Sequence, residues 1–359
     1  MIDFTPSEEQ ALVVETVRQF AEKELRPIAR KCEETRTLPA EVLARAHELG
    51  LVANALPDAF GGGGERNAVT GALVAEELAW GDLALALAVL SPALGALPIA
   101  DFGSEAQQQA HLPRFLGDGF VPGALAIPEP RIGSDAFRPA TLARRDASDY
   151  VLDGAKCLVP WLPGGDDVIV TASESGVAHA FIVPRRAAGL TAMPDATMGV
   201  SALPLVDLTL SGVRVPGSAR LAAFDVRRLV ARGRVALAAC GVGLARAAFE
   251  LARDYAKERE AFGTKIVQKQ AIAFLLANMA IEIDGARLLV WEAAWQLDQG
   301  DDALREATLA INQVKRVALD AADGAVQVLG GHGYIREYLP ELQLRNARGL
   351  SAFEGIALV

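Results

Sequence analysis

The stretch QKQAIAFLLANMAIEI, residues 268–283, has the spacing of a long helix that packs inside a bundle. Its apolar side chains recur at offsets of 3, 4, 7 and 11 residues and share one helix face: Ile272, Leu275, Leu276, Met279 and Ile283. The helical pattern continues to about residue 299, and similar segments cover 226–257 and 302–329. These segments predict a C-terminal four-helix bundle.

Upstream of the bundle the pattern changes twice. Between residues 121 and 215, short β-branched runs alternate with prolines and glycines, which is typical of a small β-barrel or sandwich. The runs lie at 150–152, 168–171, 180–183 and 206–210. The first 120 residues have helical patterns, with capping boxes at Ser7–Gln10 and Ser104–Gln107.

We therefore expect an α+β multi-domain chain. Its predicted parts are an N-terminal α-helical domain at 1–120, a middle β-barrel/sandwich domain at 121–223 and the four-helix bundle at 224–359.

The composition excludes several classes of protein. The chain has 359 residues, of which 51% are hydrophobic, enough for a large buried core. Its net charge of −10 argues against nucleic acid as a partner, because phosphate binding needs a basic face. Cys32, Cys157 and Cys240 lie far apart, so we expect no disulfide, no metal site and a cytoplasmic location. Residues 1–4 lack a basic segment, so no signal peptide is expected.

One apolar segment has to be considered as a membrane span. Leu83 to Ala100 contains no charged residue. It contains Pro92, Gly95 and Pro98, which would interrupt a spanning helix. We expect two short buried helices with a kink, and no membrane span.

Five stretches resemble motifs of the acyl-CoA dehydrogenase family, in that family's order and spacing. They are GSEAQQ (103–108) with Leu112-Pro113, EPRIGSD (129–135), EREAFG (258–263) with Ile266 and Gln270, QVLGGHGY (327–334) with REY (336–338), and LRNAR (344–348) leading to FEG (353–355). The resemblance covers nearly the whole chain. It implies the three-part fold described above and FAD-dependent conversion of an acyl-CoA thioester to the 2-enoyl-CoA. Electrons would then pass to an electron-transfer flavoprotein.

The resemblance makes Glu354 the catalytic base, which removes the α-proton while the β-hydride moves to the flavin. Burial beside apolar groups makes a carboxylate more basic, and Phe353, Ile356 and the flavin ring are expected to provide that environment. Gly355 would leave room for the thioester. For a lone glutamate, the alternative is an exposed side chain near the end of the chain.

The resemblance also implies two sets of cofactor residues and a substrate set. The chain's own FAD would lie against Ile127, Pro128, Gly133, Ser134, Leu158, Val159 and Pro160. A neighbouring subunit's FAD would be contacted by Arg259, Phe262, Gln270, Gln327, Gly330 and Gly331, so a homo-oligomer (dimer or tetramer) is expected. The acyl-CoA would contact Ser134, Arg234, Phe353 and Gly355. Alternatively, Ser134 is a turn residue, Arg234 a helix-packing residue and Arg259 a surface charge.

Three positions depart from the family pattern, all on the chain's own FAD site. Pro128 replaces a threonine, the run Leu158–Pro160 replaces Trp-Ile-Thr with Trp161 three positions late, and Ile356-Ala357 replaces Thr-Ser. The family's last helix is also absent. Losing three hydrogen bonds of about 0.5–1.5 kcal/mol each weakens FAD binding by a few kcal/mol.

These departures leave other functions open. The chain could be an FAD-poor subunit of a hetero-oligomer that lends Arg259 and Gln270 to a related chain, or a non-redox structural or CoA-binding homologue. An oxidase that uses O₂ directly fits less well.

Overall fold

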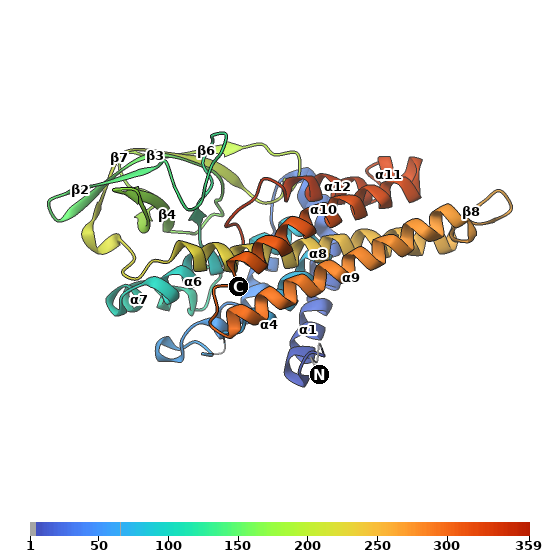
Figure 1. Ribbon diagram of the computed structural model, residues 1–359, viewed down its shortest axis with the longest axis horizontal. Helices are drawn as coiled ribbons and strands as arrows, with labels where there is room; N and C mark the ends of the chain where they lie inside the picture. The colour runs from blue at the N-terminus through green and yellow to red at the C-terminus, as the bar shows by residue number, and fades with distance from the viewer. Residues whose placement is uncertain (1–4, 65) are drawn as a thin grey trace.

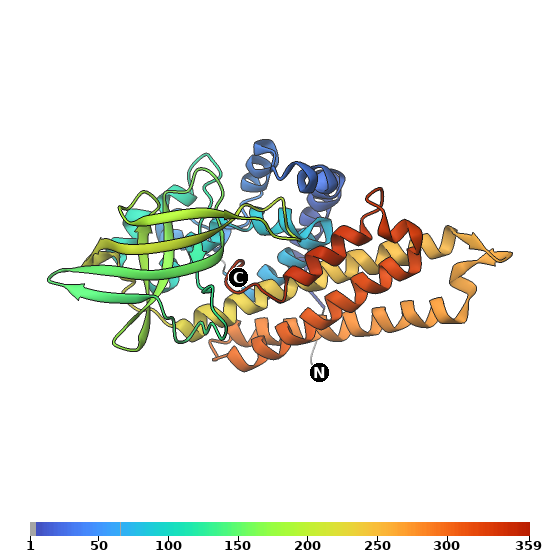
Figure 2. The same cartoon turned by 90° about the horizontal axis from the view of Figure 1, so that it is seen from above.

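The computed structural model describes residues 5–64 and 66–359, with helices at both ends of the chain and a β-sheet between them (Figure 1). The sheet forms one end of the molecule and a long helical bundle forms the other (Figure 2). This order confirms the fold class expected from the sequence. The prediction that the chain has no signal peptide rests on residues 1–4, and these lie outside the described residues.

The N-terminal part is helical because its apolar residues recur at helical spacing and its caps are correct. The helices are α1 (Glu8–Phe20), α2 (Ala29–Thr35), α3 (Ala40–Glu48), α4 (Ala68–Gly81), α5 (Leu83–Val89), α6 (Pro92–Phe102) and α7 (Glu105–His111). Both predicted capping boxes are present, at the first turns of α1 and α7. The helices α5 and α6 are short, buried and bent by 45° relative to each other, as the prolines predicted.

The middle part is a seven-stranded sheet. Its strands are β1 (Leu125–Ala126), β2 (Leu142–Asp146), β3 (Asp149–Pro160), β4 (Asp167–Glu174), β5 (Val177–Pro184), β6 (Leu190–Asp195) and β7 (Leu205–Pro216). Strands β3, β4, β5 and β7 cover the four predicted runs. The sequence did not predict β2 and β6, because most of their side chains are solvent-facing and neither strand has a β-branched apolar run.

The strands of this sheet run in the order β1-β4-β2-β3-β7-β6, and β5 pairs with the other side of β4. The long antiparallel pair β3 and β7 has two register shifts, one between Leu152 and Gly154 and one between Lys156 and Val159. The second shift places a bulge next to β1, in the part of the sheet nearest the bundle.

The C-terminal part contains α8 (Val226–Glu258), α9 (Gln270–Asp298), α10 (Leu304–Leu329), α11 (Gly331–Tyr334) and α12 (Pro340–Gly349). A small hairpin of β8 (Glu260–Ala261) and β9 (Thr264–Lys265) projects from the end of the bundle, where α8 turns into α9 (Figure 1). Helix α8 is long and apolar enough to cross a membrane by length and composition. Of the 18-residue stretch of α8 that meets this criterion, 78% is buried, because α4, α9 and α10 pack around the helix.

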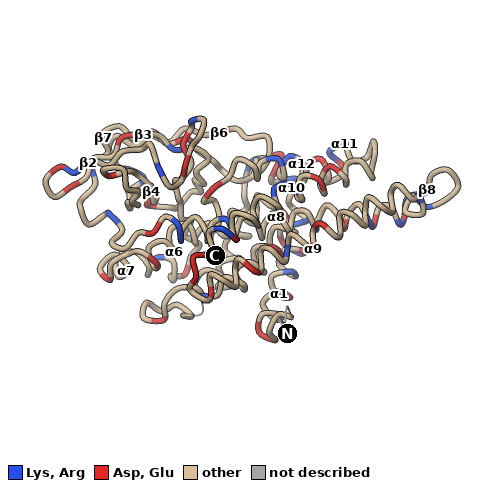
Figure 3. Tube along the Cα trace, viewed as in Figure 1, with Lys and Arg blue, Asp and Glu red and all other residues tan. Residues whose placement is uncertain are grey.

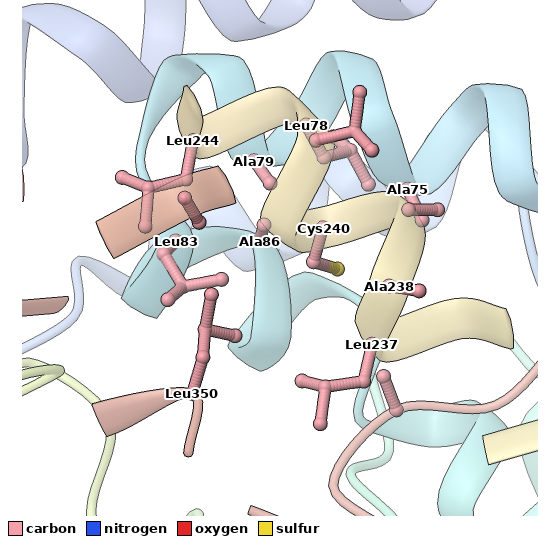
Figure 4. Packing of buried hydrophobic residues seen from close by; sticks show 14 of the residues in the cluster. Ala75, Leu78, Ala79, Leu83, Ala86, Leu237, Ala238, Cys240, Leu244 and Leu350 are labelled. Carbon is pink, nitrogen blue, oxygen red and sulfur yellow. The ribbon is translucent and has the colours of Figure 1, made fainter. Parts of the chain in front are cut away.

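The close contact between α4 and α8 needs a residue without a side chain. Figure 4 shows Ala75, Leu78 and Ala79 of α4 packed against Cys240 and Leu244 of α8. A Cβ atom on Gly243 would lie 2.1 Å from the carbonyl oxygen of Glu76. Only glycine therefore allows these two backbones to approach so closely.

We expect Gly243→Ala to lower the free energy of unfolding by about 1–3 kcal/mol, because the added methyl group pushes α8 away from α4. The matched control is Gly285→Ala on α9, where a Cβ would meet nothing within 4 Å. That variant should gain about 0.5–1 kcal/mol from helix propensity. Urea unfolding of the three proteins measures both changes, and equal effects of the two substitutions would contradict the prediction.

Candidate active site

Glu354 lies in the segment that follows α12 and enters the middle of the molecule. The chain end lies between the sheet and the bundle in both views (Figures 1 and 2). Phe353 is 3% exposed and its ring packs toward Gly349, so it points into the core. Gly355 has φ +70°, and a Cβ there would lie 2.5 Å from Ile127 Cδ1. This glycine lets the segment bend past the strand β1 and leaves the Glu354 side chain half-buried.

The partner of Glu354 is Arg234 on α8. Its Nη2 donates to Glu354 Oε2 at 2.9 Å, and its Nε lies 3.2 and 3.3 Å from the two carboxylate oxygens. Arg234 Nη1 also donates to Thr308 Oγ1 on α10 at 2.7 Å. The carboxylate is therefore held by a fork of N–H donors, and not by the apolar surroundings that the sequence suggested.

A second cation, Lys315, lies on α10 and is influenced by the charge of Glu354. Burial lowers the pKa of the Lys315 ammonium, the charge of Glu354 raises it, and the charge of Arg234 lowers it. Thr308 and Lys315 are seven residues apart and share a face of α10. Sequence reasoning missed both residues. The only available signal was two polar residues on the face of an amphipathic helix that is otherwise buried.

The segment after Glu354 is fixed by buried arginines. The carbonyl oxygen of Val359 accepts hydrogen bonds from Arg66 and Arg232, each at 2.9 Å. Asp101 pairs with Arg66 and lies 3.6 Å from Arg232. Burial lowers the pKa of Arg232 to about 10. Together these contacts hold the Val359 end of the short segment that carries the carboxylate.

The residues expected to contact the chain's own flavin form an apolar wall near this segment. Ile127 and Pro128 follow β1, and Cys157 N donates to Pro128 O at 3.0 Å. Leu158 is half-buried in the β3 bulge with φ +55°, a left-handed conformation that costs energy for leucine. Val159 and Pro160 are buried. Trp161 stacks on Arg185, whose guanidinium carbon lies 4.1 Å from the ring centroid.

A buried lysine joins the strands behind this wall. Lys156 is 0% exposed, and its Nζ donates to Glu129 Oε1 at 3.0 Å, Ile127 O at 3.1 Å and Thr171 Oγ1 at 3.1 Å. Glu129 accepts two further bonds, from the backbone N–H groups of residues 140 and 141, each at 2.8 Å. Burial lowers the pKa of Lys156 to about 8, although Glu129 opposes the shift. This pair fixes β1 and β3 relative to each other.

Gly133 and Ser134 lie in the exposed loop after β1. Gly133 has φ +73°, and Ser134 Oγ accepts a hydrogen bond from Glu129 N at 3.0 Å. The serine side chain thus closes the turn, while its hydroxyl proton stays available to a ligand. Phe137, farther along the loop, lies under the Arg234 guanidinium at 5.9 Å.

The second cofactor set lies elsewhere, on the outer part of the bundle. Arg259, Phe262, Gln270, Gln327, Gly330 and Gly331 are all exposed. Phe262 is 96% exposed at the tip of the β8–β9 hairpin, with φ +54°. That hairpin is at the far end of the molecule from the chain terminus (Figures 1 and 2). A single chain therefore does not bring the two cofactor sets together.

These surfaces fit the FAD that the resemblance implies. A Cβ added to Gly330 or Gly331 would meet nothing within 4 Å, so the backbone there is open to a ligand. The Arg259 guanidinium has no ion pair within the described part of the chain and suits a phosphate. The apolar wall at Ile127 and Leu158 suits the face of a flavin ring.

A cavity with a volume of about 520 Å³ lies away from Glu354, among the N-terminal helices, beside Val74, Leu90 and Val359. Glu354 is nevertheless the candidate site, because it combines a half-buried carboxylate with a paired guanidinium. Within the described residues, no group of three or more His, Cys, Asp or Glu side chains could hold a metal ion.

Comparisons with known proteins agree over almost the full chain. The family model for the acyl-CoA dehydrogenase N-terminal domain matches residues 7–118, and that for the C-terminal domain matches residues 225–357. A probable acyl-CoA dehydrogenase of Bacillus subtilis is 36% identical over 369 residues, which cover 99% of this chain and 96% of that protein.

Two further similarities bear on cofactor and partner. A caffeyl-CoA reductase–Etf complex subunit of Acetobacterium woodii is 31% identical over 367 residues, covering 98% of this chain and 96% of that protein. The crystal structure of a glutaryl-CoA dehydrogenase from Mycobacterium smegmatis in complex with FADH2 is 28% identical, with a TM-score of 0.88. It is matched over 97% of this chain and 91% of that one.

We expect Lys156→Met to lower the free energy of unfolding by about 3 kcal/mol, because it leaves the buried Glu129 carboxylate without its main cation. The double variant Lys156→Met/Glu129→Gln should recover most of this loss. An exposed lysine, Lys31→Met, is the control. Urea unfolding at pH 7 measures all three, and a double variant no better than the single one would contradict the pairing.

The difference in free energy of unfolding between the wild type and the Lys156→Met/Glu129→Gln double variant should depend on pH, and the pKa of Lys156 sets the sign of this dependence. The folded-state pKa of Lys156 is about 8, below its ordinary value of 10.5, so above pH 8 the unfolded chain holds the proton more tightly. Stability rises with pH wherever the unfolded state binds more protons. The wild type should therefore gain about 1–2 kcal/mol relative to the double variant between pH 8 and 10.

Proposed function

Because this chain belongs to the acyl-CoA dehydrogenase family, a family of FAD-dependent oxidoreductases, we propose that it oxidises an acyl-CoA thioester to the 2-enoyl-CoA. The observation that carries this proposal is the position of Glu354. It is a half-buried carboxylate next to Ile127 and paired with Arg234, in a segment whose end at Val359 is held by Arg66 and Arg232.

In this proposal Glu354 is the catalytic base. The bond from the α-carbon to its proton breaks, the proton moves to a carboxylate oxygen of Glu354, and negative charge develops on the thioester oxygen. An FAD held against Ile127 and Leu158 would supply the acceptor for the hydride that leaves the β-carbon. As Glu354 becomes neutral, Arg234 remains as a cation beside the new negative charge and favours its formation.

Arg234 is the positioning residue for this base. Its bond to Thr308 fixes the guanidinium, and the guanidinium then fixes the carboxylate.

We expect Glu354→Gln to abolish the anaerobic bleaching of bound flavin by acyl-CoA, with a loss of at least about 1,000-fold in rate, because an amide cannot take the α-proton. FAD content and the unfolding transition should stay close to those of the wild type. The matched control is Glu48→Gln, an exposed glutamate on α3. Bleaching by Glu354→Gln at the wild-type rate would refute the assignment.

We further propose that the chain works as a homo-oligomer. Helix α9 presents large exposed apolar side chains at seven-residue intervals: Phe274 (61% exposed), Ile281 (68%), Leu288 (44%) and Trp295 (56%). Such a stripe on one side of a long helix is typical of a helix–helix interface. A second copy that covers it could also bring its Arg259 and Phe262 to the first copy's FAD.

The electron acceptor that we propose is an electron-transfer flavoprotein. A relative of nearly equal length is a subunit of a complex with such a protein. We also propose a cytoplasmic location, since Cys32, Cys157 and Cys240 are all free thiols in the structure.

One observation favours a second candidate, an FAD-poor subunit of a hetero-oligomer. Pro128, Leu158 and Val159 offer the chain's own flavin no side-chain donor, and the backbone N–H of Cys157 is already bonded. Residues that would serve a neighbour's FAD are all accessible. Colour separates the candidates: a yellow homo-oligomer with one FAD per chain supports the first, and a colourless protein supports the second.

We expect Ile281→Glu to reduce the mass of the oligomer and its FAD content together, because a charge in the middle of the α9 stripe opposes association. The control is Leu12→Glu, an equally exposed apolar residue (69%) on α1. Light scattering after gel filtration and absorbance at the flavin band measure the two properties. An unchanged mass of the Ile281 variant would contradict the proposed interface.

A further inference from the structure

A cavity of about 520 Å³ lies among α1, α4 and α6, and the candidate active site makes no use of it. Its floor is apolar and buried, with four side chains that are each no more than 7% exposed: Val74, Leu90, Leu97 and Leu358. The exposed side chains that line it are polar and form its rim: Ser7, Glu9, Asn54 and Asn67. A volume of this size is typical of a small-molecule site, and this division of polarity fits a ligand with an apolar chain and a polar head.

Arg66 lines the same cavity and gives its wall a positive charge. Nη1 of Arg66 pairs with Asp101, and Nη2 donates to Val359 O at 2.9 Å. Nε of Arg66 is buried, and within residues 5–64 and 66–359 it has no hydrogen-bond partner. A buried donor without an acceptor costs free energy, and a guanidinium N–H bonds most strongly to an oxyanion. A ligand with an anionic head would supply the acceptor that this donor lacks.

Two guanidinium groups share one carboxylate here. Asp101 pairs with Arg66 and lies 3.6 Å from Arg232 Nε, so the three side chains together carry one positive charge. Glu9 is an acid on the rim, but it is exposed in the first turn of α1, where water and salt screen its charge. The cavity therefore favours a head with a single negative charge. A carboxylate carries one charge at pH 7, whereas a phosphate monoester carries up to two.

We propose that this cavity binds a single-chain aliphatic carboxylate, with the chain on the apolar floor and the carboxylate at Arg66. The site is independent of the proposed dehydrogenation, because no ligand atom has to reach Glu354. A bound chain would contact Leu358, which belongs to the segment that carries Glu354, and would add apolar contacts to that segment.

The first test compares three ligands that share an eight-carbon chain: octanoate, 1-octanol and octyltrimethylammonium. Calorimetry at pH 7 on the full chain as purified measures their Kd values. We expect octanoate to bind at least about 10-fold more tightly than 1-octanol, since it forms a hydrogen bond between charged groups. Octyltrimethylammonium should bind most weakly. No detectable binding of octanoate, or equal Kd values for octanoate and 1-octanol, would overturn the proposal.

A filled cavity tests where the chain lies. Val74→Phe adds volume to the floor and should weaken octanoate binding at least about 10-fold. The matched control is Val177→Phe, an exposed valine (58%) on β5, which should leave the Kd unchanged. Thr70→Phe, at a half-buried position of the cavity wall, replaces Val74→Phe if that variant does not fold. Wild-type affinity in a folded variant with a filled cavity refutes the site.

A charge variant tests where the head lies. Arg66→Gln removes the charged donor, so the Kd of 1-octanol divided by that of octanoate should fall to near one. Arg66→Lys keeps the charge and should retain most of this ratio. The control Arg145→Gln, at an exposed arginine on β2, should leave it unchanged. A wild-type ratio in Arg66→Gln contradicts the assignment of the head to Arg66.

Competition separates this cavity from the substrate site. Saturating octanoyl-CoA should leave the Kd of octanoate unchanged, whether or not that thioester bleaches the flavin. Displacement of octanoate by octanoyl-CoA would place both ligands in one site and overturn the inference, while the proposed dehydrogenation would stand.

Discussion

The ion pair between Arg234 and Glu354 connects the helical bundle to the segment that carries the candidate base. It joins α8 to a segment 120 residues farther along the chain, and through Thr308 it reaches α10. The segment can meet Arg234 only because Gly355 lets it bend past Ile127 and because buried arginines hold its end at Val359. Without the pair, the carboxylate would have no fixed place between sheet and bundle.

Charged residues of both signs are distributed along the whole trace, as Figure 3 shows, and a few of them are buried. Lys156 shows how a buried charge is kept in the fold. All three of its donors are filled, and the ammonium holds strands together.

The sequence predicted those features that follow from local periodicity. Helical spacing and capping residues located the long helices, and the run of motifs located Glu354. It did not predict β2 and β6, whose side chains are mostly solvent-facing, because their order depends on pairing with β3 and β7. The sequence analysis predicted apolar neighbours for Glu354, because its partner Arg234 is distant along the chain. Arg234 and the α10 face with Thr308 and Lys315 come together only after the helices have packed.

The hairpin between α8 and α9 has a genetic consequence if it completes the site of a neighbouring copy. Damage at Arg259 would then disable the neighbour's site, whereas damage at Glu354 disables the chain's own. Consider a dimer that pairs a chain damaged at Arg259 with a chain damaged at Glu354. One of its two sites carries both defects, and the other carries neither. Two alleles that are each inactive would thus complement one another within a single assembly, although neither chain carries a whole site.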